Sequence, residues 1–214
     1  MVLAARRLDR LEALAAELPQ AEVLELDVRD ADGVRAALAK FEFDLVVANA
    51  GLARGTDPIQ RVEESAWDDM IDTNVKGVLA VIRATLPGMI VRGRGDMVLL
   101  GSVAGRQVYP GGNVYCATKH AVRALYEALR LDAAGTGVRF TTVDPGMVET
   151  EFSKVRLGNE DQARAVYKGF SPLKPEDVAD AISFAVTRPA HVNIGEIVLW
   201  PSDQASTTMV ERSE

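Results

Sequence analysis

The chain has few residues of the kinds that build disulfide scaffolds or metal centres. Its 214 residues include one cysteine, Cys116, and two histidines, His120 and His191. A single cysteine forms no internal disulfide, which is typical of a reducing compartment, so we expect a cytoplasmic protein. The two isolated histidines have no metal-site spacing around them, and we therefore expect no metal.

Positive charge and long apolar runs are also scarce. Acidic residues outnumber basic ones by 31 to 24, and no basic stripe is present, so we expect no nucleic-acid partner. No run of about 18 apolar residues occurs, so we expect no membrane-spanning segment. The N-terminal stretch is Arg-rich and amphipathic like a transit peptide, but it carries Asp9, Glu12 and Glu17, which such peptides avoid.

Strand-like and helix-like patterns alternate along the whole chain. Strands are predicted near residues 2–4, 23–26, 45–48, 97–101, 138–143 and 196–200, and helices near 9–18, 32–40, 65–90, 115–134 and from 174 onwards. The segment 147–175 is polar. This alternation predicts right-handed crossovers and a mostly parallel sheet with helices on both faces. We expect residues 1–214 to form a single α/β domain with a doubly wound, Rossmann-like parallel sheet.

Small or polar residues follow five consecutive predicted strands, which is where ligands bind in such sheets. They are Arg6 and Arg7, then Asp27, then Asn49, Ala50 and Gly51, then Ser102, then Asp144, Pro145 and Gly146. Taken alone, residues 49–51 are equally compatible with a strand-ending turn, and Asp27 with a helix cap. Their gathering at one edge of the sheet predicts a ligand site there.

Tyr115 and Lys119 lie four residues apart on a predicted helix, so their side chains share a face. A tyrosine beside a fixed cation is a route to a phenolate. The ordinary tyrosine pKa is near 10, so use at pH 7 needs a shift of roughly 3 units, or about 4 kcal/mol. One lysine supplies part of that shift, and a second positive charge, such as an oxidised nicotinamide, has to supply more. Alone, such a pair is usually no more than a pair on a helix surface.

Several motifs occur in the order known from one enzyme family. Asn49-Ala50-Gly51, Asn74, Ser102, Tyr115-x-x-x-Lys119 and Pro145-Gly146 give a chain that resembles the short-chain dehydrogenase/reductase family over its whole length. The runs IDTNVKGVL, GGNVYCATK, TEFSKVR and PAHVNI are similar to those of NADP-dependent 3-hydroxy acid dehydrogenases, which are also described as serine or allo-threonine dehydrogenases.

The resemblance implies a role for each motif residue. Tyr115 would be the general acid/base, Lys119 would lower its pKa and hold the nicotinamide ribose, and Ser102 would hydrogen-bond the substrate oxygen. Asn74 would anchor a water of the proton relay, although it also fits a polar residue that faces solvent. Implied cofactor contacts are Arg6, Arg7, Asp27 (with the adenine), Val28, Asn49, Ala50, Gly51, Tyr115, Lys119, Pro145, Gly146, Val148 and Thr150.

Two arginines bear on the choice of cofactor. Arg6 and Arg7 follow the first strand with no acid at the junction, which favours the 2′-phosphate of NADP(H) over the free ribose of NAD. A solvated helix start is the alternative, although two cations fit poorly beside the positive end of a helix dipole.

One family feature is absent from the sequence. A glycine-punctuated strand–turn–helix should precede Val2, so the chain begins at the family's second strand and lacks its first βα unit. That strand belongs between the first and third strands present, and its loss would leave unpaired backbone in the sheet. The sequence is therefore either an incomplete form of a normal dehydrogenase or a true short chain with an impaired cofactor site.

The charged segment 147–175 lies over the substrate in this family. Within it, Arg156 suits a substrate carboxylate, with a solvated loop arginine as the alternative. We therefore expect an NADP-dependent oxidoreductase of small 3-hydroxy acids. The alternatives are a carbonyl or 3-oxoacyl reductase of the same family, and a truncated, catalytically impaired subunit or interaction protein. The two long helices have enough apolar surface to pair across a two-fold, so we expect a homodimer or homotetramer.

Overall fold

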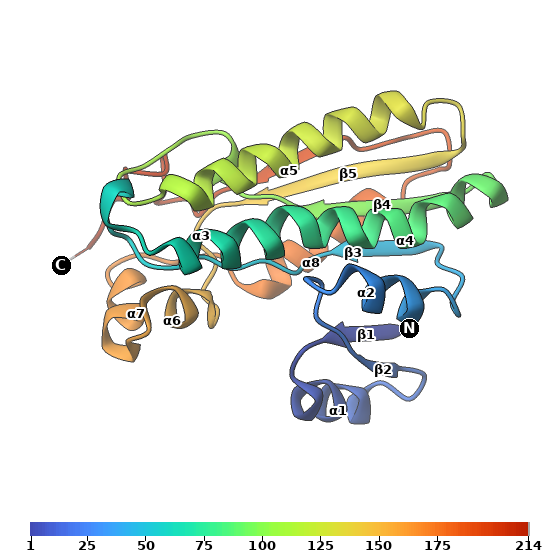
Figure 1. Cartoon of the computed structure of the whole chain (residues 1–214). Helices are drawn as coiled ribbons and strands as arrows, with labels where there is room; N and C mark the ends of the chain where they lie inside the picture. Colours follow the sequence, from blue (N-terminus) through green and yellow to red (C-terminus); the bar gives the residue numbers. More distant parts are fainter. Residues whose placement is uncertain (214) are drawn as a thin grey trace.

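The computed structural model describes residues 1–213 as strands alternating with helices (Figure 1). The strands are β1 (Val2–Ala5), β2 (Glu22–Glu25), β3 (Leu45–Ala48), β4 (Gly95–Leu100), β5 (Val138–Pro145) and β6 (Glu196–Leu199). The helices are α1 (Leu8–Glu17), α2 (Ala31–Leu38), α3 (Glu64–Ile71), α4 (Gly77–Arg92), α5 (Asn113–Asp132), α6 (Phe152–Leu157), α7 (Glu160–Val166) and α8 (Pro175–Val186). Every strand pairing is parallel, which confirms the α/β class and the Rossmann-like fold.

The strands form two separate sheets. Within residues 1–213, β1 pairs with β2, while the other four strands lie in the order β3-β4-β5-β6. Residues of β1 and β3 line one cavity of about 940 Å³, and Figure 1 shows β1, β2 and α1 set apart from the larger sheet. The break lies where the sequence predicts it, between the first and third strands. The absence of the family's first βα unit stays a prediction.

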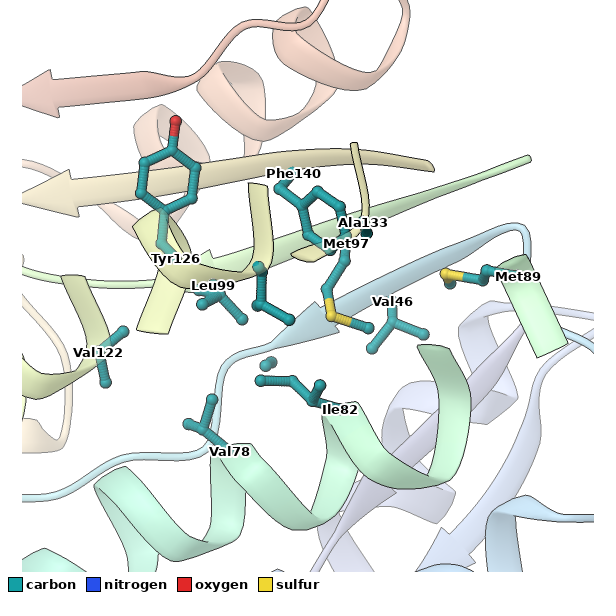
Figure 2. Close-up of a cluster of buried hydrophobic side chains, with 12 residues drawn as sticks. Val46, Val78, Ile82, Met89, Met97, Leu99, Val122, Tyr126, Ala133 and Phe140 are labelled. Carbon is teal, nitrogen blue, oxygen red and sulfur yellow. The ribbon is translucent and has the colours of Figure 1, made fainter. Parts of the chain in front are cut away.

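The main hydrophobic core lies between the larger sheet and helices α4 and α5 (Figure 2). Met97 and Leu99 of β4 meet Ile82 of α4 and Tyr126 of α5, and all four side chains are buried. The opposite face of the sheet packs Val98 and its neighbours against α8. Strands β4 and β5 are therefore apolar on both faces, as in other sheets covered by helices on two sides.

The predicted long helix is interrupted. A π-helical turn, η2 (Asp72–Lys76), joins α3 to α4. Counted together, the helical residues Glu64–Arg92 are long and apolar enough, by length and composition alone, to cross a membrane. This does not contradict the sequence, which has no unbroken run of about 18 apolar residues, because Lys76 and Arg83 lie within the stretch. In the fold, α4 packs its inner side chains on β3 and β4 and forms part of the core.

The polar segment 147–175 contains more regular structure than its sequence suggests. It folds into the short helices α6 and α7. Neither has enough apolar residues for a clear helical period, which is why the sequence pattern showed only a charged connection.

Candidate active site

Tyr115 and Lys119 lie in the first turns of α5 with nearly buried side chains, 8% and 6% exposed. The Nζ atom of Lys119 donates a hydrogen bond of 2.8 Å to the carbonyl of Leu100 at the end of β4, and lies 6.0 Å from the centre of the Tyr115 ring. The fold thus places phenol and ammonium side by side at the carboxyl end of the sheet.

Burial works against both charged forms. It raises the pKa of Tyr115 well above its ordinary value, and the Ser102 hydroxyl and the Arg156 guanidinium reverse only part of that rise. Burial lowers the pKa of Lys119 to about 8, and the nearby Asp144 carboxylate opposes this shift. The side chains alone therefore do not produce a phenolate at neutral pH, so a further positive charge has to supply the shift.

Ser102 follows β4 and is the N-cap of the 3₁₀ helix η3 (Val103–Gly105). Its Oγ accepts a hydrogen bond of 3.1 Å from the Ala104 N–H and donates a long one of 3.4 Å to the Pro145 carbonyl. A donor bond of that length is weak, so the hydroxyl can turn to a better acceptor without much loss.

Asn74 sits in the π turn η2 and is 1% exposed, so the interpretation that it faces solvent is wrong. Its Oδ1 accepts from the Leu52 N–H at 2.8 Å, and its Nδ2 donates to the Leu52 carbonyl at 2.8 Å and to Thr118 Oγ1 at 3.0 Å. The side chain therefore ties the loop after β3 to α5. π turns of this kind are frequent at functional sites.

The cavity between the two sheets collects most of the predicted cofactor residues. It is lined by Arg6, Arg7, Asp27, Val28, Asn49, Ala50 and Gly51, among others. A Cβ placed on Gly51 would lie 3.4 Å from Asn74 Oδ1 and 3.6 Å from Lys119 Nζ. The cavity therefore opens beside Asn74 and Lys119.

Asp27 is held by a neighbouring cation. Arg29 Nη2 donates to its Oδ2 at 2.7 Å, and this bond holds the pKa of the Asp27 carboxyl below its ordinary value. The N-cap of α2 is Asp30, which accepts from the Gly33 N–H at 3.0 Å. The helix-cap interpretation of Asp27 is thus wrong.

An acidic partner of Arg7 was missed at the sequence level. Glu151, just before α6, accepts from Arg7 Nη1 at 2.9 Å and from Arg10 Nη2 at 2.8 Å, and the two arginines lower the pKa of its carboxyl. Arg10 lies in the first turn of α1, three residues after its N-cap Arg7, but nothing in the sequence pointed to Glu151. A carboxylate bridged by two arginines shows that this corner accepts an anion.

Apart from Tyr115 and Lys119 of α5, the remaining predicted cofactor residues lie at the end of β5 or beyond it. Pro145 ends that strand, and a Cβ on Gly146 would lie 2.5 Å from Gln204 Oε1, so a side chain does not fit there. The carbonyl of Val148 accepts from the Tyr167 hydroxyl at 2.8 Å, and Thr150 Oγ1 accepts from the Phe152 N–H at 3.1 Å. Val148 and Thr150 are not among the residues that line the cavity.

Arg156 of α6 is fixed against the phenol. Its Nε, Nη1 and Nη2 donate to the Gly55 carbonyl at 2.9 Å, the Tyr109 hydroxyl at 2.7 Å and the Gly111 carbonyl at 3.1 Å. The guanidinium carbon lies 5.8 Å from the centre of the Tyr115 ring. The interpretation of Arg156 as a solvated loop residue is therefore wrong. Its anchors lie in loops that only the fold brings close to α6.

Comparison with known proteins agrees with this geometry. Residues 1–161 match the model of the short chain dehydrogenase family. The chain belongs to the short-chain dehydrogenase family. It is 41% identical to an NADP-dependent 3-hydroxy acid dehydrogenase of Schizosaccharomyces pombe, covering 100% of this chain and 87% of that protein.

Two further relatives extend the comparison. Sulfoacetaldehyde reductase 2 of Chromohalobacter salexigens is 44% identical, covering 96% of this chain and 85% of that protein. A serine dehydrogenase solved in a closed form with NADP+ is 40% identical and superposes with a TM-score of 0.94, covering 100% of this chain and 89% of that one. The chain thus shares the fold and sequence of short-chain dehydrogenases, among them relatives that are named or solved as NADP-dependent.

The residues of this short-chain dehydrogenase fit an anionic dinucleotide. The cavity offers arginines at the β1 end and reaches Asn74 and Lys119 at Gly51. Among the described residues, no group of three or more histidine, cysteine or acidic side chains is arranged to hold a metal ion.

Proposed function

We propose that the chain interconverts small 3-hydroxy acids and the corresponding 3-oxo acids, using Ser102, Tyr115, Lys119 and Asn74. The observation that carries this proposal is the position of Arg156, whose guanidinium lies 5.8 Å from the Tyr115 ring centre. A fixed cation beside the proton-transferring phenol favours a substrate with its negative charge a short distance from the reacting oxygen.

Arg156 retains donors for such a substrate. A guanidinium has five N–H groups, and three of those of Arg156 serve the carbonyls of Gly55 and Gly111 and the Tyr109 hydroxyl. Two remain for a carboxylate, which arginine binds through paired hydrogen bonds. The protein anchors thus orient the guanidinium without using up its capacity.

Each catalytic side chain then has a defined task. Tyr115 exchanges a proton with the substrate oxygen, and Ser102 hydrogen-bonds the same oxygen by leaving its weak bond to Pro145. Lys119 keeps positive charge beside the phenol and holds the ribose of the cofactor. Asn74 fixes the turn next to α5 and anchors a relay water. When bound, NADP supplies the hydride acceptor.

We assign the cavity between the sheets to the cofactor. Arg6 and Arg7 would bind the 2′-phosphate, with Arg10 added by its shared contact to Glu151. Asp27 and Val28 would face the adenine. The turn Asn49–Gly51 and the end of β5 at Pro145 and Gly146, with Val148 and Thr150 beyond it, would face the nicotinamide end.

The same cavity supports a proposal about the sheet. β1 pairs only with β2, and β3 only with β4, so among the described strands the edge of each that faces the cavity has no pairing partner. Leu45 and Val47 of β3 are 41% and 39% exposed. One further parallel apolar strand would pair with both edges. Fusing the Gly-rich strand–turn–helix unit of a family member before Met1 should tighten NADPH binding and raise the melting temperature. No change in either would contradict this proposal.

A homodimer or homotetramer is supported by exposed apolar residues on the two long helices. Leu79 and Val91 of α4 are 43% and 87% exposed, and Leu131 of α5 is 79% exposed. Covering them in a two-fold interface would remove apolar surface from water. Light scattering should give twice or four times the chain mass, and a monomer would contradict this. The single buried cysteine supports a cytoplasmic location.

A second candidate function is the reduction of a small anionic carbonyl compound. The relative named sulfoacetaldehyde reductase 2 is 44% identical to this chain, and a sulfonate also matches the two free donors of Arg156. A neutral carbonyl or a 3-oxoacyl substrate has no charge at that distance to use. A panel of carboxylate, sulfonate and neutral substrates separates these candidates.

The test of the main proposal is Arg156→Ala. It should raise KM for 3-hydroxypropionate at least tenfold, because a charge-assisted pair contributes about 1.5 to 3 kcal/mol, and should change KM for a neutral alcohol far less. Arg156→Lys should fall between, since it keeps the charge without the paired geometry. Equal losses for charged and neutral substrates would reject the proposal.

A further inference from the structure

One buried carboxylate near the site has no task in the chemistry above. Asp144, on β5, is 1% exposed. Its Oδ2 accepts from Arg106 Nε at 2.7 Å, and its Oδ1 accepts from Thr142 Oγ1 at 2.7 Å. A carboxylate removed from water is strongly unfavourable unless it is paired and hydrogen-bonded, so Arg106 makes the ionised form tolerable here.

This carboxylate lies against the segment that carries Ser102. A Cβ placed on Gly101 would be only 1.8 Å from Asp144 Oδ1, so the carboxylate occupies the space of that missing side chain. At the other end of the segment, Arg106 directly follows η3, whose N-cap is Ser102. Asp144 therefore contacts the Ser102 loop on both sides of the hydroxyl.

The same carboxylate lies near Lys119. The Lys119 Nζ atom bonds to the carbonyl of Leu100, which directly precedes Gly101, so ammonium and carboxylate flank the same end of β4. The other charged or titratable groups around the ammonium are Tyr115 on the same helix and, beside its ring, Arg156 from α6. Asp144 is the one carboxylate among the groups named here.

We propose that Asp144 and Arg106 are a positioning pair, which holds the Ser102 loop against β5 and supplies the negative charge that keeps Lys119 protonated beside Tyr115. This inference rests on the proposed function, because it assumes the roles given there to Ser102 and Lys119. Glu196 on β6 also accepts from Arg106. The guanidinium is thus shared between one buried and one exposed carboxylate.

Two variants break this pair but leave opposite charges behind. Asp144→Asn removes the negative charge and should move the titration of Lys119 to lower pH by about one unit. Arg106→Gln removes the competing cation but keeps a hydrogen-bond donor. The carboxylate, still bonded to Thr142, should therefore stay ionised beside the ammonium and move that titration to higher pH. The probe is the Cε resonance of ¹³C-labelled lysine, assigned with Lys119→Met. Shifts of the same sign in both variants, or none in either, would overturn the proposal.

A matched control exists at the other end of the same two strands. Asp96 of β4 pairs with Arg139 of β5 at 2.7 Å, so Asp96→Asn also removes an ion pair between the strands. It should lower stability without moving the Lys119 titration. Arg106→Lys should return that titration toward its original midpoint. A shift in the Asp96 variant would mark a general loss of packing and overturn the proposal.

The second measurement is the pH profile of kcat/KM for the same variants. Its Lys119-dependent limb should follow the NMR shifts, downward for Asp144→Asn and upward for Arg106→Gln. If the shifts appear but the enzyme does not turn over hydroxy acids, the proposed substrate fails and the positioning pair stands. If turnover is normal and Lys119 does not shift, the pair fails and the proposed function stands.

Discussion

The two sheets of the molecule differ in how many of their residues are buried. The β3–β6 sheet has a core on each face, and six consecutive residues of β5 are buried. In the β1–β2 sheet no residue of either strand is buried, and the buried residue of α1, the helix that packs on it, is Leu11. The side chains that we propose as catalytic lie beside the larger sheet, while the arginines that we assign to NADP lie beside the smaller one.

Because of this difference, the two groups of side chains are not equally fixed in position before a ligand binds. Tyr115 and Lys119 are held by the packed core, so their geometry exists before any ligand binds. The side chains of Arg7 and Arg10 are exposed. The smaller sheet and its loops contact the rest of the fold at points such as Val28 and Gly77, where a Cβ on Gly77 would lie 2.6 Å from Val28 Cγ2. Ligands that bind only the native state stabilise it, so NADP binding should order the smaller sheet.

The largest expected effect is a loss of activity beside the larger sheet without a loss of cofactor binding. Tyr115→Phe removes the proton donor and should lower kcat by about 10² to 10⁴-fold, the usual contribution of general acid/base catalysis. NADPH binding, measured by fluorescence, should change little because the cofactor arginines are intact. A variant that keeps more than a tenth of the activity would show that another group moves the proton.

Stability should also differ between the sheets. Met97→Ala opens a cavity in the main core, where Met97 is fully buried, and should lower the free energy of unfolding by about 2 to 5 kcal/mol. Leu24→Ala in β2, at a half-buried site, should lower it by less than about 1.5 kcal/mol. Urea denaturation measures both. Equal losses would contradict the difference between the sheets.

Lys119 gives the larger sheet a pH dependence. Its pKa is near 8 in the folded chain, so between pH 8 and its unfolded pKa the unfolded chain binds more protons. The free energy of unfolding should therefore rise with pH, by about 1.6 kcal/mol between pH 8 and 9.5. Lys119→Met should flatten this slope, and a slope that persists in the variant would assign it to other groups.

The smallest expected effects concern the exposed arginines. Arg7→Ala should weaken NADPH binding several-fold and leave NADH binding nearly unchanged, because only the 2′-phosphate is lost as a partner. Glu151→Gln should strengthen NADPH binding about twofold, since it removes a competing carboxylate, and more so at low salt. Arg35→Ala, an exposed arginine paired with Asp32, is the control. Parallel losses for NADPH and NADH would contradict the 2′-phosphate assignment.

Much of the fold was predictable from local patterns. The apolar run Leu45–Ala48 is β3 to the residue, and the spacing of Tyr115 and Lys119 placed both on one face of α5. These features depend on neighbouring residues alone. The break between β1 and β3 followed from comparing the order of motifs with the strand order of the fold.

What the sequence did not predict depends on residues far apart along the chain. Arg156 is fixed by Gly55, Tyr109 and Gly111, which lie 101 to 45 residues away. Glu151 reaches Arg7 across 144 residues. The burial that raises the pKa of Tyr115 is likewise a property of the packed core. No periodicity or motif encodes these contacts.

Amide hydrogen exchange, with and without NADPH, tests the contrast between the two sheets most directly. Amides of β4 and β5 should be strongly protected in both states, whereas those of β1 and β2 should exchange at least about a hundredfold faster without cofactor and slow markedly when NADPH binds. Equal protection of both sheets without cofactor, unchanged by NADPH, would contradict the account.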